Sequence, residues 1–135
     1  MALDLRLAGR AALNGLVFVL PAAIAGAVLA DDGGDLAAGP AIAVAGVQIL
    51  GFTFSGWVVR KLVPGSAMAT CALGGVGCAV LVQAFGIVSS LVRGTALHPL
   101  TWVATLLVAA LAGCAGGLLA RVERAPTPGS DRHAN

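Results

Sequence analysis

The chain has 135 residues, of which 59% are hydrophobic and only 10% are charged, and its mean hydropathy is +0.96. A water-soluble domain of this length needs more charged surface, so the composition excludes an ordinary soluble protein and predicts an integral membrane protein in contact with the lipid bilayer. The formal net charge of +2 is too small to favour nucleic-acid binding, and we expect no nucleic-acid partner.

The N-terminal part of the chain predicts a cytoplasmic lead-in over residues 1–10 and a first membrane span over about 11–30. A helix of that length covers ~30 Å, which is the hydrocarbon thickness of a bilayer. Pro21 lies in the middle of this span and predicts a kink, because proline cannot donate a backbone hydrogen bond. The sequence Val28-Leu29-Ala30 also suits signal-peptide cleavage, but the apolar run is longer than a usual signal core, so we expect the span to be retained.

Three further apolar runs predict three more spans. They cover about residues 41–59, 66–92 and 100–120, and a Pro/Gly/Ser-rich tail at 125–135 is expected to be disordered and cytoplasmic. The sequence therefore predicts an all-α, polytopic membrane protein. We expect residues 11–124 to form a compact bundle of four transmembrane helices.

The distribution of basic residues predicts the orientation of the bundle. Seven lysines and arginines fall on one side of the four spans, and only Arg93 falls on the other. By the positive-inside rule both termini are cytoplasmic, and we expect a multi-pass protein of the bacterial cytoplasmic (inner) membrane. The residues expected to orient the protein or to contact lipid head groups are Arg60, Lys61, Arg121 and Arg124.

Small residues recur at helical spacing along the spans. Such residues hold membrane helices together, because they let two backbones approach closely. Any stripe left uncovered after the bundle closes would serve contact with another membrane protein or with a second copy of the chain. The predicted packing residues are Gly51, Ser55, Thr70, Gly74, Cys78, Gly113 and Gly117.

Asp, Glu, Lys, Arg and His are missing from the interior of every predicted span, and the turn after the second span offers only Arg60 and Lys61, with no carboxylate or histidine. Proton-coupled transporters and membrane enzymes usually need such groups, so we expect no catalytic residue, no metal site and no cofactor.

The polar residues that remain inside the spans are uncharged: Asn14, Gln48, Thr53 and Gln83. Gln48 and Gln83 lie at similar depths, ~12 and ~14 Å from the outer ends of their spans. One interpretation is a hydrogen bond between them that holds two helices together. The other is a polar constriction in a pore.

Three glycine-rich stretches carry a family resemblance. They are Gly51 to Lys61 (GFTFSGWVVRK), the start of the third span around Gly65 and Gly74-Gly75, and Ala112 to Gly117 (AGCAGG). In these stretches, and in length and order of spans, the chain resembles the small four-helix bacterial membrane proteins of the YrzE-like type. It departs from them in its acidic turn at 31–35 and in its cysteines. That family has no established activity, so the resemblance implies the fold and transfers no site residue.

Two functional hypotheses follow. The first is a non-enzymatic integral membrane protein that acts as an accessory or interaction subunit and packs through small-residue helix faces. The alternative is a small homo-oligomeric channel or transporter with a weakly polar path along Gln48, Gln83, Thr53 and Asn14.

Overall fold

The protein folds into four long helices, and a computed structural model describes residues 5–30, 35–94 and 99–123. All regular structure in these ranges is helical, and every helix is long and apolar enough to cross a membrane. The predicted fold class is confirmed, and the chain is a multi-pass integral membrane protein; the side of the membrane that the termini face stays a prediction. The helices are α1 (Leu5–Leu29), α2 (Ala38–Leu62), α3 (Met68–Arg93) and α4 (Pro99–Val122).

Helix α1 begins at Leu5, within the segment 1–10 that we expected to be a lead-in. The reason is packing: Leu7 is buried in a cluster that also contains Val59 of α2. Burial of an apolar side chain favours continuation of the helix beyond the hydrocarbon boundary that the sequence suggests. The helix also continues through Pro21.

The connection between α2 and α3 is a short turn, and α3 begins at Met68 instead of Ser66. The backbone N–H of Ser66 donates to the carbonyl of Val63 over 2.9 Å, which holds Ser66 in the turn. The guanidinium of Arg60 donates to the Ser66 carbonyl and closes the same turn. The predicted tail at 125–135 lies outside the described residues.

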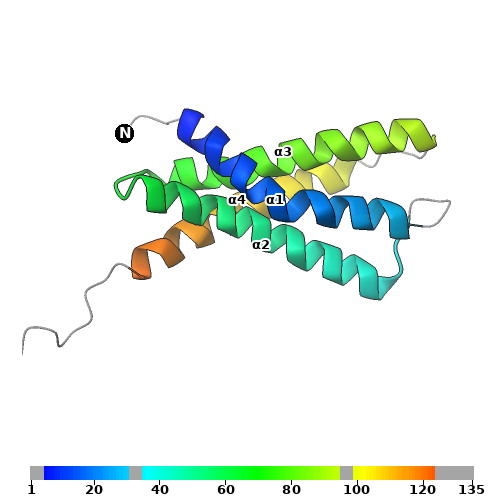
Figure 1. Cartoon of the computed structure of the whole chain (residues 1–135), viewed down its shortest axis with the longest axis horizontal. Coiled ribbons are helices and arrows are strands. Elements are labelled where there is room, and N and C mark those ends of the chain that lie inside the picture. Colours follow the sequence, from blue (N-terminus) through cyan, green and yellow to red (C-terminus); the bar gives the residue numbers. More distant parts are fainter. Residues whose placement is uncertain (1–4, 31–34, 95–98, 124–135) are drawn as a thin grey trace, which may run out of the picture.

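The helices run alternately up and down, as Figure 1 shows. Helices α2 and α3 each contact the other three helices, whereas α1 and α4 lie on opposite sides and share no contact within the described ranges. The start of α1, the α2–α3 turn and the end of α4 gather at one end of the bundle. We call this the basic end, because it carries Arg60, Lys61 and Arg121, and we call the other the Arg93 end.

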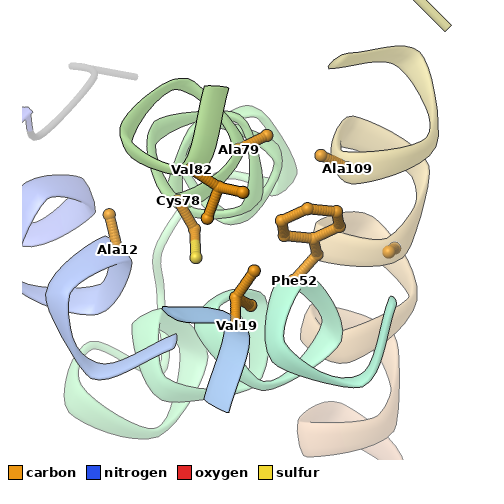
Figure 2. Packing of buried hydrophobic residues seen from close by; sticks show 8 residues of the cluster. Ala12, Val19, Phe52, Cys78, Ala79, Val82 and Ala109 are labelled. Carbon is orange, nitrogen blue, oxygen red and sulfur yellow. The ribbon is translucent and has the colours of Figure 1, made fainter. Parts of the chain in front are cut away.

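Tight packing is confined largely to the half of the bundle near the basic end. In α2, α3 and α4 the buried residues fall within 51–59, 70–82 and 109–120, whereas those of α1 extend from Leu7 to Gly26. Near mid-bundle the ring of Phe52 lies among buried side chains that include Val19, as Figure 2 shows. The bundle is therefore closed toward the basic end and more open toward the Arg93 end.

Candidate functional site

Helices α2 and α4 cross at glycines that leave no room for a side chain. A Cβ atom added at Gly56 would collide with the carbonyl of Gly113. One added at Gly116 would collide with the carbonyl of Thr53 and lie 2.8 Å from the backbone nitrogen of Trp57. Because the opposing atoms are backbone, no change of rotamer could relieve these collisions. Glycine is therefore what permits the close approach of the two helices.

The α1–α2 and α3–α4 contacts follow the same principle. A Cβ at Gly51 would collide with Val19 and lie 3.2 Å from the carbonyl oxygen of Gly15. A Cβ at Gly117 would lie 2.8 Å from the sulfur of Cys71. These three pairs of helices are thus brought together by small residues.

All seven residues that the sequence singled out for packing are buried in the bundle, namely Gly51, Ser55, Thr70, Gly74, Cys78, Gly113 and Gly117. Four further glycines make equally close contacts between helices: Gly15, Gly56, Gly75 and Gly116. Gly75 and Gly116 directly neighbour the predicted Gly74 and Gly117 and belong to the same small-residue faces. The predicted packing residues are therefore buried in contacts between helices of the same chain.

The two glutamines make separate contacts. In the part of the chain that the structure describes, the Nε2 atom of Gln83 donates to the backbone carbonyl of Trp102 over 3.0 Å, and not to Gln48. This bond connects α3 to α4 in the open half of the bundle. Gln48 is half-buried and lines clefts on both sides of α2.

Asn14 and Thr53 direct their polar atoms into their own helices. The Nδ2 atom of Asn14 donates to the carbonyl of Arg10 over 3.1 Å, and the hydroxyl of Thr53 donates to the carbonyl of Ile49 over 2.9 Å. Such bonds from residue i to residue i−4 satisfy a polar side chain without a partner helix. The structure therefore does not bring these two residues together with Gln48 and Gln83 into one continuous polar surface.

A small polar cluster ties α2 to α4 at the basic end. The Nζ atom of Lys61 lies 2.7 Å from Glu123 Oε2 and 5.0 Å from the centre of the Trp57 ring. The indole nitrogen of Trp57 donates to the same carboxylate over 3.2 Å. The turn itself lacks a carboxylate, and the fold supplies one from the end of α4. Arg121, two residues before Glu123 in the sequence, is exposed, and Arg124 lies outside the described residues.

A cleft of about 280 Å³ opens at the Arg93 end between α1, α2 and α3. It is lined by Gln48 and Val82 near the middle of the bundle and by Ser89, Ser90 and Arg93 toward the end of α3. From Val82 to Arg93 the helix rises ~17 Å, which is about half of a hydrocarbon core that is ~30 Å thick. The cleft thus spans about the depth of one bilayer leaflet.

The end of α3 is set by Gly94, which has a φ angle of 68°. This left-handed conformation is costly for residues with a Cβ atom, and it is a common way to end a helix. The N–H of Gly94 donates to the carbonyl of Ser90. Arg93 is therefore the last helical residue, at the rim of the cleft.

Two further clefts lie between α2 and α4. One, of about 230 Å³, is lined by Gln48, Phe52 and Thr105; the other, of about 400 Å³, lies nearer the basic end and is lined by Trp57 and Glu123 among apolar residues. Phe52 is one helical turn beyond Gln48 and only 1% exposed. Its ring therefore closes the space beneath Gln48 toward the basic end.

Within the described ranges, no three His, Cys, Asp or Glu residues come together into a metal centre. Cys71 and Cys78 are buried, and Cys114 is half-buried.

The chain matches no protein-family model, no curated protein and no solved structure. The assignment of the chain as a four-helix multi-pass membrane protein therefore depends on the length and apolar character of its own helices. The YrzE-like resemblance stays a prediction.

Proposed function

We propose that this chain is a non-enzymatic protein of the bacterial inner membrane, with both termini in the cytoplasm, that acts as an accessory subunit. Its partner would be a transmembrane helix of another membrane protein. The observation that carries this proposal is an open row of small residues on the half of α2 nearest the Arg93 end. The row consists of Gly39, Ala43 and Gly46, and we call it the α2 stripe.

The α2 stripe differs from the glycines of the packed half in having no atoms against it. A Cβ at Gly39 or Gly46 would meet nothing within 4 Å, whereas one at Gly56 would collide with the backbone of α4. All three stripe residues are exposed, and the adjacent Ile42 is 74% exposed. The stripe is thus available on the surface that faces lipid.

Physical chemistry favours a helix over lipid as the occupant of such a stripe. Lipid chains pack against any apolar side chain, so lipid gains little from small residues. A second helix gains more, because small residues allow its backbone to approach closely. The spacing of four and three residues places Gly39, Ala43 and Gly46 on one helix face.

The non-enzymatic part of the proposal is supported by the chemistry of the spans. Their apolar parts contain no Asp, Glu, Lys, Arg or His in the sequence. At the basic end, Lys61 and Glu123 are engaged with each other. Acid–base and phosphoryl-transfer chemistry in a membrane generally needs several such groups directed at a substrate.

Site-specific photocrosslinking tests the proposed interaction. A photoreactive residue placed at Ala43 should give one defined crosslinked product with another membrane protein, and the added change Gly46→Leu should abolish this product. The matched control is Gly9→Leu, because a Cβ at Gly9 also meets nothing within 4 Å but lies on α1 at the basic end. The control should leave the product unchanged.

Two other outcomes would overturn the accessory role. A crosslink to a second copy of the chain would favour the homo-oligomeric channel, and a flux assay on Gln48→Leu and Gln83→Leu would then test the polar path. Crosslinking to lipid alone would show that the α2 stripe has no protein partner.

A further inference from the structure

We propose that two thiols in the basic half of the bundle bind one soft monovalent metal ion, with Cu(I) as the ion of this class. The ligands would be Cys71 of α3 and Cys114 of α4, with the thioether of Met68 beside them. This inference departs from the expectation of no metal site, because a soft ion needs neither histidine nor carboxylate ligands. It does not rest on the accessory role, because none of these residues belongs to the α2 stripe.

The side chains of Cys71 and Met68 meet at Gly117, in the contact between α3 and α4. A Cβ atom added at Gly117 would lie 2.8 Å from Cys71 Sγ and 3.7 Å from Met68 Cε, the methyl carbon bonded to the thioether sulfur. Met68 and Cys71 are three residues apart on α3, so they share one face of that helix. A thiol and a thioether thus lie together against α4.

Cys114 comes to the same place from the other helix. It lies one helical turn before Gly117 and directly follows Gly113, where an added Cβ would lie 2.6 Å from the carbonyl oxygen of Cys71. Cys71 therefore contacts α4 on both sides of Cys114. The two thiols are close enough to affect each other's ionisation. The α3–α4 contact thus brings one thiol from each helix to one point.

A buried hydroxyl beside these thiols points independently to a missing partner. Ser66 is only 9% exposed, and its Oγ makes no hydrogen bond within the part of the chain that the structure describes. Ser66 is also close enough to the Cys71 thiol to affect its ionisation. A buried hydroxyl without a partner is unfavourable. A metal-bound thiolate at Cys71 would satisfy it, because its negative charge makes the sulfur a better acceptor.

The donor set favours a soft ion over zinc. Thiolate and thioether sulfur select Cu(I), whereas structural zinc takes four ligands, and no three His, Cys, Asp or Glu residues come together in the described ranges. Each thiol loses its proton when Cu(I) binds, so two protons are released and the bis-thiolate complex carries one negative charge. The guanidinium of Arg60 is near enough to Cys71 to compensate that charge.

The site can be reached from the basic end of the bundle. Cys71 is fully buried, but Cys114 and Met68 are half-buried, and Met68 is the first residue of α3 after the α2–α3 turn. The basic end is predicted to face the cytoplasm, where thiols stay reduced, as metal binding requires. An ion can therefore reach the thiols past Met68 without crossing the membrane.

Native mass spectrometry of the full chain in mild detergent tests the site. Cu(I) is supplied as its acetonitrile complex without oxygen, and Zn²⁺ is the second probe. We expect one copper ion per chain, with a mass that corresponds to the loss of two protons, and no retained zinc. Cys114→Ala should abolish copper retention. Cys78→Ala is the matched control and should leave it unchanged, because Cys78 is buried on the same helix as Cys71 but lies in the mid-bundle cluster of Figure 2.

Met68→Leu tests the contribution of the thioether. Leucine keeps a similar apolar volume and removes the sulfur, so the fold should be retained. Copper binding should weaken by about tenfold, a usual loss when a group beside the metal ligands is removed. Competition with a chromophoric Cu(I) chelator in solution measures this change. It also keeps the test valid if Cys114→Ala fails to fold.

Four results would overturn the proposal: no copper retained by the unsubstituted chain, equal retention by Cys114→Ala and Cys78→Ala, equal retention of copper and zinc, or unchanged affinity in Met68→Leu. The accessory role is tested separately, because the crosslink from Ala43 does not depend on any cysteine. Failure of one proposal is thus distinguishable from failure of the other.

Discussion

Replacement of Gly116 by alanine tests whether the α2–α4 crossing depends on direct backbone contact. The new Cβ would collide with the carbonyl of Thr53 and lie 2.8 Å from the backbone nitrogen of Trp57. An ordinary contact needs about 3.5 Å, so α2 and α4 must move apart. That movement loosens every contact along the crossing, including the one between Gly56 and Gly113.

The expected magnitude follows from two opposing effects. Overpacking of a well-packed interior costs about 1–3 kcal/mol, and the upper part of this range applies because the opposing atoms are backbone. Alanine offsets about 1 kcal/mol of this loss, because its helix propensity is higher than that of glycine. We therefore expect the free energy of unfolding to fall by about 2 kcal/mol in Gly116→Ala.

Reversible unfolding in mixed micelles with increasing denaturing detergent provides the measurement. Gly86→Ala is the control, because its Cβ would meet no atom within 4 Å, and it should raise the free energy of unfolding by up to about 1 kcal/mol. If Gly116→Ala is as stable as the control, the α2–α4 crossing does not depend on backbone contact, and the packing argument fails.

Three further predictions concern single contacts and topology. A double-mutant cycle on Lys61→Met and Glu123→Gln should give a coupling of at most about 1 kcal/mol that weakens with added salt, because their side chains are 34% and 51% exposed; coupling unaffected by salt would contradict this. Gln83→Leu should lower the free energy of unfolding by about 0.6–1 kcal/mol through loss of its bond to Trp102, and an unchanged value would show that the bond contributes nothing. A cysteine introduced at Ser130 should react with an impermeant maleimide only from the cytoplasmic side, and labelling from outside would reverse the predicted orientation.

The helical membrane fold could be predicted from the sequence because its determinants are local. Long apolar runs interrupted by charged or proline-containing turns specify helices that span a bilayer, whatever each helix touches. The burial of residues such as Gly74 and Gly113 also follows from a local pattern, since small residues at helical spacing form one face. The ends of the helices were harder to predict from the sequence, because packing of Leu7 extends α1 beyond its apolar run.

The pairing of residues from different helices depended on the tertiary structure. Similar depth suggested a bond between Gln48 and Gln83, but depth along a helix does not determine the direction in which a side chain points. The rotation of α3 about its axis directs Gln83 to the Trp102 carbonyl of α4. In the same way, Glu123 follows α4 in sequence, and only the crossing of α2 and α4 brings it to Lys61.

The sequence by itself determined that the chain crosses the membrane as four helices rich in small residues, because hydropathy and helical spacing act over a few turns of one helix. Only the tertiary structure decided that the glycines close one half of the bundle and leave a cleft in the other. That difference arises because helices diverge from a close crossing, so the space between them depends on crossing positions and angles, which no single helix specifies. The cleft that results contains Arg93, which the sequence alone presents as an isolated charge in a turn.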